Sequence, residues 1–138
     1  CQDNLSCSTY AVIRGLHYQL HPESLSKSVS VVEGKVYDVA VDLRKDSSTF
    51  GKWYGIILDA ESKTQFLIPQ GFAHGFSVLS ERAVFTYKCD NLYNPSLEGG
   101  IRLNDPDLNI DWMIPEEKRI ISEKDTKHPF FKDVITNF

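Results

Sequence analysis

Apolar and polar residues along this chain alternate mostly with a period of two, which is typical of β-strands with one buried face. Turn-forming segments such as 33–35, 44–51, 59–63 and 80–82 separate stretches rich in β-branched and aromatic residues. We expect strands over 29–32, 36–43, 53–58, 66–69, 75–79 and 84–89. Many short strands at this spacing predict an all-β sandwich or closed barrel.

Helix signals are weak and come late in the chain. Ser122 and the acidic residues after it predict the start of a short C-terminal helix, and Pro129 should end it. We therefore expect only a few short helical turns, all near the C-terminus.

Residues 36–42 alternate in an informative way. Tyr37, Val39 and Val41 form an apolar face, whereas Asp38, Ala40 and Asp42 form a polar one. A solvent-exposed sheet edge would explain the pattern. A barrel with a partly polar interior would explain it equally well, because the predicted strands around Lys27 and Tyr87 also mix ionisable and apolar residues on one face.

Residues 13–19 carry a guanidinium and an imidazole three residues apart, Arg14 and His17. Regular alternation would place these side chains on opposite faces of a strand. We expect Gly15 to mark a bulge that turns both toward one site. The alternative is a solvated arginine and a structural histidine.

Composition is that of an ordinary globular chain and excludes some classes of protein. The 138 residues are 41% hydrophobic and 25% charged, which suits one domain with a core. The net charge of −4 argues against a general nucleic-acid binder, and no apolar run approaches the ~20 residues of a membrane span. Cys1, Cys7 and Cys89 lack metal-type spacing, which favours reduced thiols in the cytoplasm.

A metal site is the first chemistry to consider. The segment from Pro69 to His74 resembles the PxGxxH box of the cupin superfamily, in which the histidine is often a metal ligand. A metal needs three or four ligands, yet His17 is followed by Tyr18 and Gln19 rather than by a second histidine, and His21 has poor strand spacing for a shared site. We therefore expect no metal.

Acid–base chemistry is the stronger candidate. His17 can act as a general base, with Asp125 or Asp38 accepting from its other ring nitrogen. Tyr87 could be a general acid, although a hydrogen-bonded core tyrosine has the same sequence pattern. Lys27 and Arg14 could bind phosphate or a developing enolate oxygen, or could be ordinary solvated charges. No nucleotide-binding glycine loop or nucleophile elbow is present.

The residues quoted so far belong to a longer resemblance. Segments 2–4, 14–19, 37–44, 49–53, 68–76, 87–89, 98–101, 104–106 and 110–112 are similar, in order and spacing, to the dTDP-4-dehydrorhamnose 3,5-epimerase (RmlC) family. The resemblance implies a single cupin jelly-roll domain over residues 1–138, without the N-terminal segment that usually precedes Gln2. It also implies a homodimer, no cofactor, and a 4-keto-6-deoxy dTDP-sugar substrate.

The resemblance also implies roles for individual residues. His17 would be the base with Asp125 as its partner, Tyr87 the acid, Asp38 a member of the same site, and Lys27 a donor to the enolate oxygen. Tyr93 would stack on thymine, and other substrate contacts would come from Gln2, Asp3, Asn4, Arg14, His74, Glu98 and Lys124. A single-centre epimerase acting on another 4-keto nucleotide sugar, and a non-catalytic nucleotide-sugar-binding cupin, are the alternatives.

Overall fold

The computed structural model describes residues 1–138, and almost all of its regular structure is β-strand. The short helical elements are α1 (Glu123–Thr126) and the 3-10 turns η1 (Pro95–Leu97), η2 (Glu116–Lys118) and η3 (Phe131–Asp133). The strands are β1 (Gln2–Thr9), β2 (Val12–Gln19), β3 (Lys27–Glu33), β4 (Lys35–Asp42), β5 (Trp53–Asp59), β6 (Gln65–Ile68), β7 (Phe72–Val78), β8 (Arg82–Cys89), β9 (Glu98–Gly100) and β10 (Ile120–Ile121).

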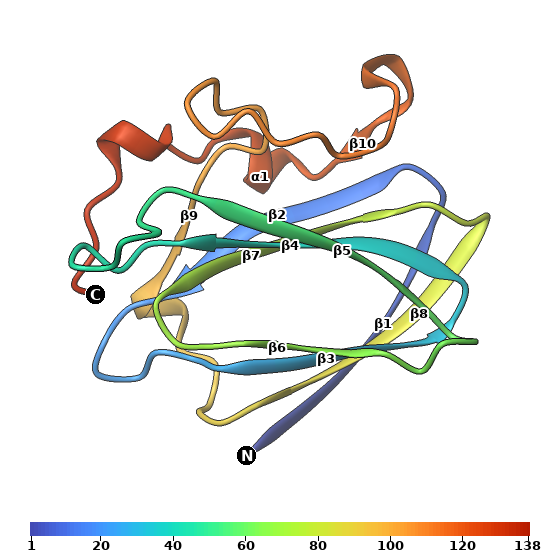
Figure 1. Cartoon of the computed structure of the whole chain (residues 1–138), viewed down its shortest axis with the longest axis horizontal. Coiled ribbons are helices and arrows are strands. Elements are labelled where there is room, and N and C mark those ends of the chain that lie inside the picture. The colour runs from blue at the N-terminus through green and yellow to red at the C-terminus, as the bar shows by residue number, and fades with distance from the viewer.

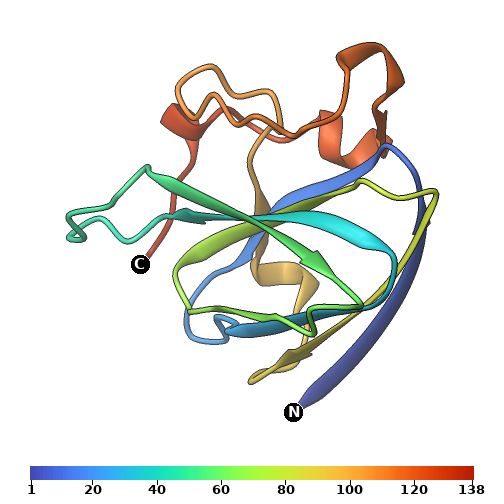
Figure 2. The same cartoon turned by 45° about the vertical axis from the view of Figure 1, so that its right-hand side comes forward.

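Two sheets face each other as the layers of a jelly roll (Figure 1). One sheet has the order β1-β8-β3-β6, and the other has the order β10-β2-β7-β4-β5 with β9 paired to β2. All pairings are antiparallel except that of β10 with β2. The chain after β9 runs over the outer face of the β2-β7-β4-β5 layer, as both views show (Figure 2).

The space between the sheets holds one of two apolar clusters. Val29 and Phe85 from one sheet pack there with Val36 and Phe76 from the other, and all four are buried. Phe76 and Phe85 meet across the sheets with ring centroids 4.4 Å apart. This cluster fills one part of the interior and leaves the rest to polar side chains.

The second cluster lies on the outer face of the β2-β7-β4-β5 layer. Val39 and Val41 pack there beneath the C-terminal segment, which contributes Trp112, Leu108 and Ile114. Because of this cover, β4 is buried on both faces. The apolar face predicted for 36–42 therefore points away from the barrel, and Asp38 on the polar face points into it and is fully buried.

The six predicted strands are confirmed, each displaced by at most three residues at an end. The predicted helix start is also confirmed, because the Ser122 side chain accepts from the backbone N–H of Asp125 at 3.3 Å and caps α1. The long strand β1 and the short strands β9 and β10 were not predicted. Their sequences are too polar or too short to show a clear alternation.

Candidate active site

A cavity of about 350 Å³ opens between the two sheets, beside the apolar cluster that fills the rest of the interior. Its walls come from β1, β2, β3, β7, β8 and β9 and from the segments before β3 and β9. The lining residues are Gln2, Asn4, Ser6, Arg14, His17, Tyr18, Gln19, Leu25, Lys27, His74, Gly75, Phe76, Phe85, Tyr87, Cys89, Tyr93 and Glu98. Most of the residues predicted to bind or transform a substrate are therefore brought together.

A bulge in β2 places Arg14 and His17 on the same wall. The register with β7 shifts between these two residues, and Gly15 adopts a φ of +127°. A Cβ at Gly15 would lie 2.6 Å from the Cα of Gly75, so only glycine fits this conformation and this close approach. The predicted bulge is confirmed, and it removes the conflict between strand alternation and a shared site.

His17 and Asp125 form a hydrogen-bonded pair. His17 Nε2 lies 2.6 Å from Asp125 Oδ1, and the Gly15 N–H donates to Oδ2 at 3.3 Å. Burial acts to raise the pKa of Asp125, but donation from His17 and Gly15 outweighs it and lowers that pKa to about 2. The carboxylate can only accept, so His17 donates through Nε2 and its Nδ1 is left free to take a proton.

Asp38 holds a different histidine. His74 Nε2 lies 2.9 and 3.0 Å from the two carboxylate oxygens of Asp38, and both residues are buried. Burial lowers the pKa of His74, and the nearby Lys27 adds to that effect against the pull of Asp38. A neutral His74 thus faces the cavity and donates to Asp38 behind it. Of the two carboxylates considered as partners for His17, Asp125 is the one in contact.

Tyr87 lies on β8, in the sheet opposite to the one that carries His17. Burial raises the pKa of the Tyr87 hydroxyl, with help from nearby Cys89 and Glu98, so the group keeps its proton at neutral pH. Lys27 lies beside it, with Nζ 5.8 Å from the centre of the Tyr87 ring. Burial lowers the pKa of Lys27, although Cys89, Asp38 and Glu98 act in the other direction.

A polar cluster stands at the rim of the cavity. The Tyr93 hydroxyl donates to Glu98 Oε2 at 2.8 Å, and Lys124 Nζ reaches the same oxygen at 2.6 Å. The Tyr93 N–H donates to the Gln2 side chain at 2.9 Å, which ties the rim to β1. Half of the Tyr93 side chain is exposed, so its ring is open to a flat ligand group.

Asp3 is the predicted site residue that neither lines the cavity nor contacts a residue of its lining. Alternation along β1 directs Gln2, Asn4 and Ser6 inward and Asp3 outward. Its carboxylate pairs with Lys88 at 2.9 Å on the exposed face of the sheet. Asp3 therefore does not belong to the cavity, because adjacent residues of a strand face opposite sides.

Several functional-site residues were not predicted from the sequence. Phe76, Phe85 and Cys89 line the cavity, and the strand pattern placed them inside without marking them as site residues. His128 is the most important omission. Its Nε2 lies 3.3 Å from Asp125 Oδ1, and the spacing of three residues from Asp125 at a predicted helix was the signal that pointed to this contact.

One group of side chains could hold a metal ion. The ligand atoms of His17, Asp125 and His128 all lie within 4.8 Å of one another. Two imidazoles and a carboxylate would suit a divalent transition metal, but both imidazole Nε2 atoms are directed at the same carboxylate oxygen in hydrogen bonds. In this structure the three side chains form a hydrogen-bonded group.

The fold and the site together define a cupin-type jelly roll whose cavity is equipped for proton transfer. His17, backed by Asp125, lies on one wall, and the protonated Tyr87 and Lys27 lie on the other. The comparisons with known proteins agree with this class. The family model for dTDP-4-dehydrorhamnose 3,5-epimerase matches residues 1–133.

Individual relatives give the same result. The Shigella flexneri dTDP-4-dehydrorhamnose 3,5-epimerase is 52% identical over 132 residues, which cover 96% of this chain and 72% of that protein. The crystal structure of the enzyme from Elizabethkingia anophelis NUHP1 is 60% identical with a TM-score of 0.95, over 96% of this chain and 73% of that one. The chain belongs to the dTDP-4-dehydrorhamnose 3,5-epimerase family.

A ligand-bound structure is also similar. The Legionella pneumophila dTDP-6-deoxy-D-glucose-3,5-epimerase, solved in complex with dTDP-4-keto-L-rhamnose, has a TM-score of 0.93 and 49% identity. The match covers 98% of this chain and 71% of that one.

Proposed function

We propose that this chain epimerises C3 and C5 of dTDP-4-dehydro-6-deoxy-D-glucose and so gives dTDP-4-dehydro-L-rhamnose, as its family membership implies. Such a reaction supplies an activated rhamnose precursor for carbohydrate biosynthesis, lipopolysaccharide among its destinations. One observation carries the assignment of roles. His17 and Tyr87 line the same cavity from opposite sheets, so a base and an acid can reach opposite faces of one sugar ring.

The chemistry starts from the C4 ketone, which acidifies the hydrogens on C3 and C5 because either carbanion is delocalised as an enolate. Nδ1 of His17 removes the proton, and Asp125 stabilises the imidazolium that forms. Tyr87 then donates its proton to the carbon from the other face and inverts the centre. Proton exchange with solvent restores both groups before the second centre reacts.

Lys27 is positioned to stabilise the enolate oxygen. Its ammonium lies in the interior next to Tyr87, where the surroundings are poor in water and a donor acts strongly. A donor of this kind lowers an enolate-type barrier by about 3–4 kcal/mol. His74, held neutral against Asp38, offers a second polar contact for the sugar.

The nucleotide part of the substrate is assigned to the rim. Arg14 is the exposed cation of the lining and suits a diphosphate oxygen. Tyr93 offers a ring on which thymine can stack, with Gln2 and Glu98 holding that tyrosine in place. Asn4 adds a polar side chain to the cavity wall, and Lys124 binds Glu98 at the rim.

The assembly and compartment are part of the same proposal. We propose a homodimer that uses the outer face of the β1-β8-β3-β6 sheet. This face carries the apolar residues Leu5, Val32 and Leu67, whose exposed fractions are 69%, 59% and 67%. The three cysteines are free thiols, which supports a cytoplasmic protein. No helix is long and apolar enough to cross a membrane.

The direct test is incubation of the purified protein with dTDP-4-dehydro-6-deoxy-D-glucose in heavy water. We expect deuterium at both C3 and C5 and formation of the L-rhamno product. Deuterium at one carbon only would point to a single-centre epimerase, and its absence from both carbons with folded protein would refute catalysis. Size-exclusion chromatography with light scattering measures the oligomeric state independently.

A further inference from the structure

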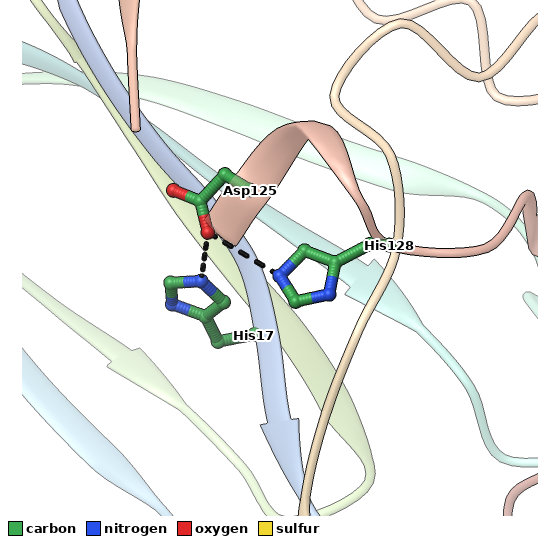
Figure 3. Close-up of side chains that lie close together, drawn as sticks. All are labelled: His17, Asp125 and His128. Atoms are coloured by element: carbon green, nitrogen blue, oxygen red, sulfur yellow. Dashed lines mark hydrogen bonds and ion pairs between the residues drawn. The ribbon is translucent and has the colours of Figure 1, made fainter. Parts of the chain in front are cut away.

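His128 lies outside the cavity wall, yet it contacts the catalytic pair. Figure 3 shows the imidazoles of His17 and His128 converging on Asp125. Their Nε2 atoms lie 2.6 and 3.3 Å from the same oxygen, Oδ1, and the rings meet edge to face with centroids 5.5 Å apart. Asp125 is 3% exposed, so its carboxylate has little access to water. Its hydrogen-bond donors are instead the two imidazoles at Oδ1 and the Gly15 N–H at Oδ2.

Contacts to its backbone and to its ring fix the position of the His128 imidazole. The guanidinium Nε of Arg102 donates to the His128 carbonyl at 2.8 Å, and the same guanidinium stacks on Phe130, 4.8 Å from its centre. The His128 ring lies against Gly100, where any Cβ would collide with three ring atoms. Gly100 is the β9 residue that pairs with His17 on β2, so the backbone that supports the His128 ring lies directly beside the catalytic base.

The state of the ring follows from its surroundings. Burial lowers the pKa of His128, and the neighbouring His17 lowers it further against the opposing effect of Asp125. A neutral imidazole carries one N–H, and the carboxylate can only accept. The proton of His128 is therefore on Nε2 and directed at Asp125, which makes His128 a fixed donor.

We propose that His128 is a positioning residue for the epimerase reaction, which orients the Asp125 carboxylate and through it the base His17. The inference rests on the proposed function and extends it by one residue. The terminal torsion of an aspartate is broad, so a carboxylate with fewer donors samples other rotations. Three donors on two oxygens select one rotation, and that rotation directs Nδ1 of His17 away from Asp125 and toward the substrate.

The kinetic test compares two substitutions at one position. His128→Ala removes the donor, and we expect kcat to fall about 10- to 100-fold with KM nearly unchanged, because the ring does not line the cavity. His128→Gln keeps an N–H near the position of Nε2 and should recover most of kcat. His21→Ala is the matched control, since that ring contacts Ser24 and Phe138 away from the catalytic pair. Equal losses in the Ala and Gln variants would overturn the proposal.

A test by displacement avoids removing the imidazole at all. Gly100→Ala places a methyl group where the His128 ring lies, and we expect a loss of kcat similar to that of His128→Ala. The double variant should be no worse than His128→Ala alone, because the methyl then has room. Circular dichroism establishes that each variant is folded. If the fold-loss of kcat in the double variant equals the product of the two single losses, the two substitutions do not act through the position of the His128 ring.

A spectroscopic readout is independent of turnover. The short hydrogen bond between His17 and Asp125 should give a far-downfield imidazole proton in the NMR spectrum of the ligand-free protein. We expect this signal to persist in His128→Gln and to broaden or vanish in His128→Ala. An unchanged signal together with an unchanged kcat refutes the proposal. If the wild type shows the signal but no turnover, the proposed function fails while the role of His128 in orienting Asp125 stands.

Discussion

The imidazole of His17 donates to a carboxylate 108 residues later in the chain, that of Asp125, across a distance of 2.6 Å. Two structural features create this contact. The bulge at Gly15 turns His17 into the cavity and supplies a backbone N–H to the same carboxylate. The single-turn helix α1, capped by Ser122, brings Asp125 back over β2. The contact therefore joins a strand of the barrel to the C-terminal segment that covers its outer face.

Replacing Asp125 by asparagine should separate orientation from charge. Asp125→Asn keeps the size of the side chain but allows the wrong tautomer of His17, and the imidazolium loses its counter-charge. We expect kcat to fall by about 10²- to 10⁴-fold with little change in KM. The measurement is steady-state conversion of the 4-keto sugar nucleotide. Asp107→Asn, at an exposed position, is the control and should keep wild-type activity.

Tyr87 should be needed for inversion but not for proton removal. In Tyr87→Phe the base His17 remains, so the enolate forms and can recover a proton only from the face on which it was lost. We expect deuterium from heavy water to enter C3 at an appreciable rate while the epimerised product falls at least about 100-fold. Tyr10→Phe, in the β1–β2 turn, serves as the control. Loss of exchange and inversion to the same extent would assign Tyr87 a different role.

The positions of the strands along the chain and the candidate base could be predicted from the sequence because both depend on local patterns. Alternation marks β3 to β8, and the pairing of Arg14 with His17 around Gly15 predicts a bulge. The partner of each histidine could not be predicted this way. From the residues alone Asp38 and Asp125 are equivalent candidates, and only the family resemblance favours Asp125. The register of β4 with β7 is what brings Asp38 to His74.

Two other features could not be predicted from the sequence for the same physical reason. Asp3 shares a motif with Gln2 and Asn4, but a motif does not state which face each residue takes, and the pleat of β1 turns Asp3 outward. The polar face of β4 looked like a possible surface edge because the sequence does not show that a C-terminal segment covers the opposite face. Burial of a strand by a segment distant in sequence leaves no periodic pattern of apolar residues in the strand itself.

Gly15 should be sensitive to the smallest possible substitution. Gly15→Ala combines a φ of +127° with a Cβ that would lie 2.6 Å from the Gly75 backbone, so β2 and β7 must separate. We expect a loss of about 1–3 kcal/mol in the free energy of unfolding from backbone strain, and a fall in kcat as His17 moves.

Gly51→Ala provides the comparison for Gly15→Ala. Gly51 also has a positive φ, +76°, but its Cβ would meet only the Phe131 ring, at 3.2 Å. This control should lose stability and keep kcat. Urea denaturation and turnover measured on both variants separate the effect of backbone strain from the effect of moving His17. Full activity in Gly15→Ala would show that the bulge does not determine the position of His17.

Chelation is expected to leave turnover unchanged. His17, Asp125 and His128 could bind a divalent ion, but the proposed proton transfer needs the Nε2 atoms of both histidines for Asp125. Dialysis against EDTA, followed by assay with and without added zinc, measures the effect. Zinc should inhibit rather than activate, because it would displace the protons that orient the pair. Restoration of lost activity by metal would require a different mechanism.

Asp42 gives a prediction about stability and pH that does not involve catalysis. Its carboxylate is 1% exposed and accepts hydrogen bonds from Arg44, Ser47 and Thr49. Burial acts to raise the pKa of Asp42, but these donors outweigh it and hold the pKa well below its ordinary value of 3.8. A lowered pKa in the folded state stabilises the protein above the unfolded pKa, and this stability is lost as the pH falls through the folded value.

Asp42→Asn should therefore destabilise the protein at pH 7 by about 2 kcal/mol, the scale of losing charge-assisted hydrogen bonds at a buried group. The difference from wild type should shrink as the pH falls below 3.8, because the wild-type carboxylate then takes up its proton on unfolding. Urea denaturation between pH 7 and pH 2.5 measures both curves. Asp46→Asn, in the same loop and exposed, should follow wild type throughout. A constant difference across this range would show that Asp42 acts through packing rather than charge.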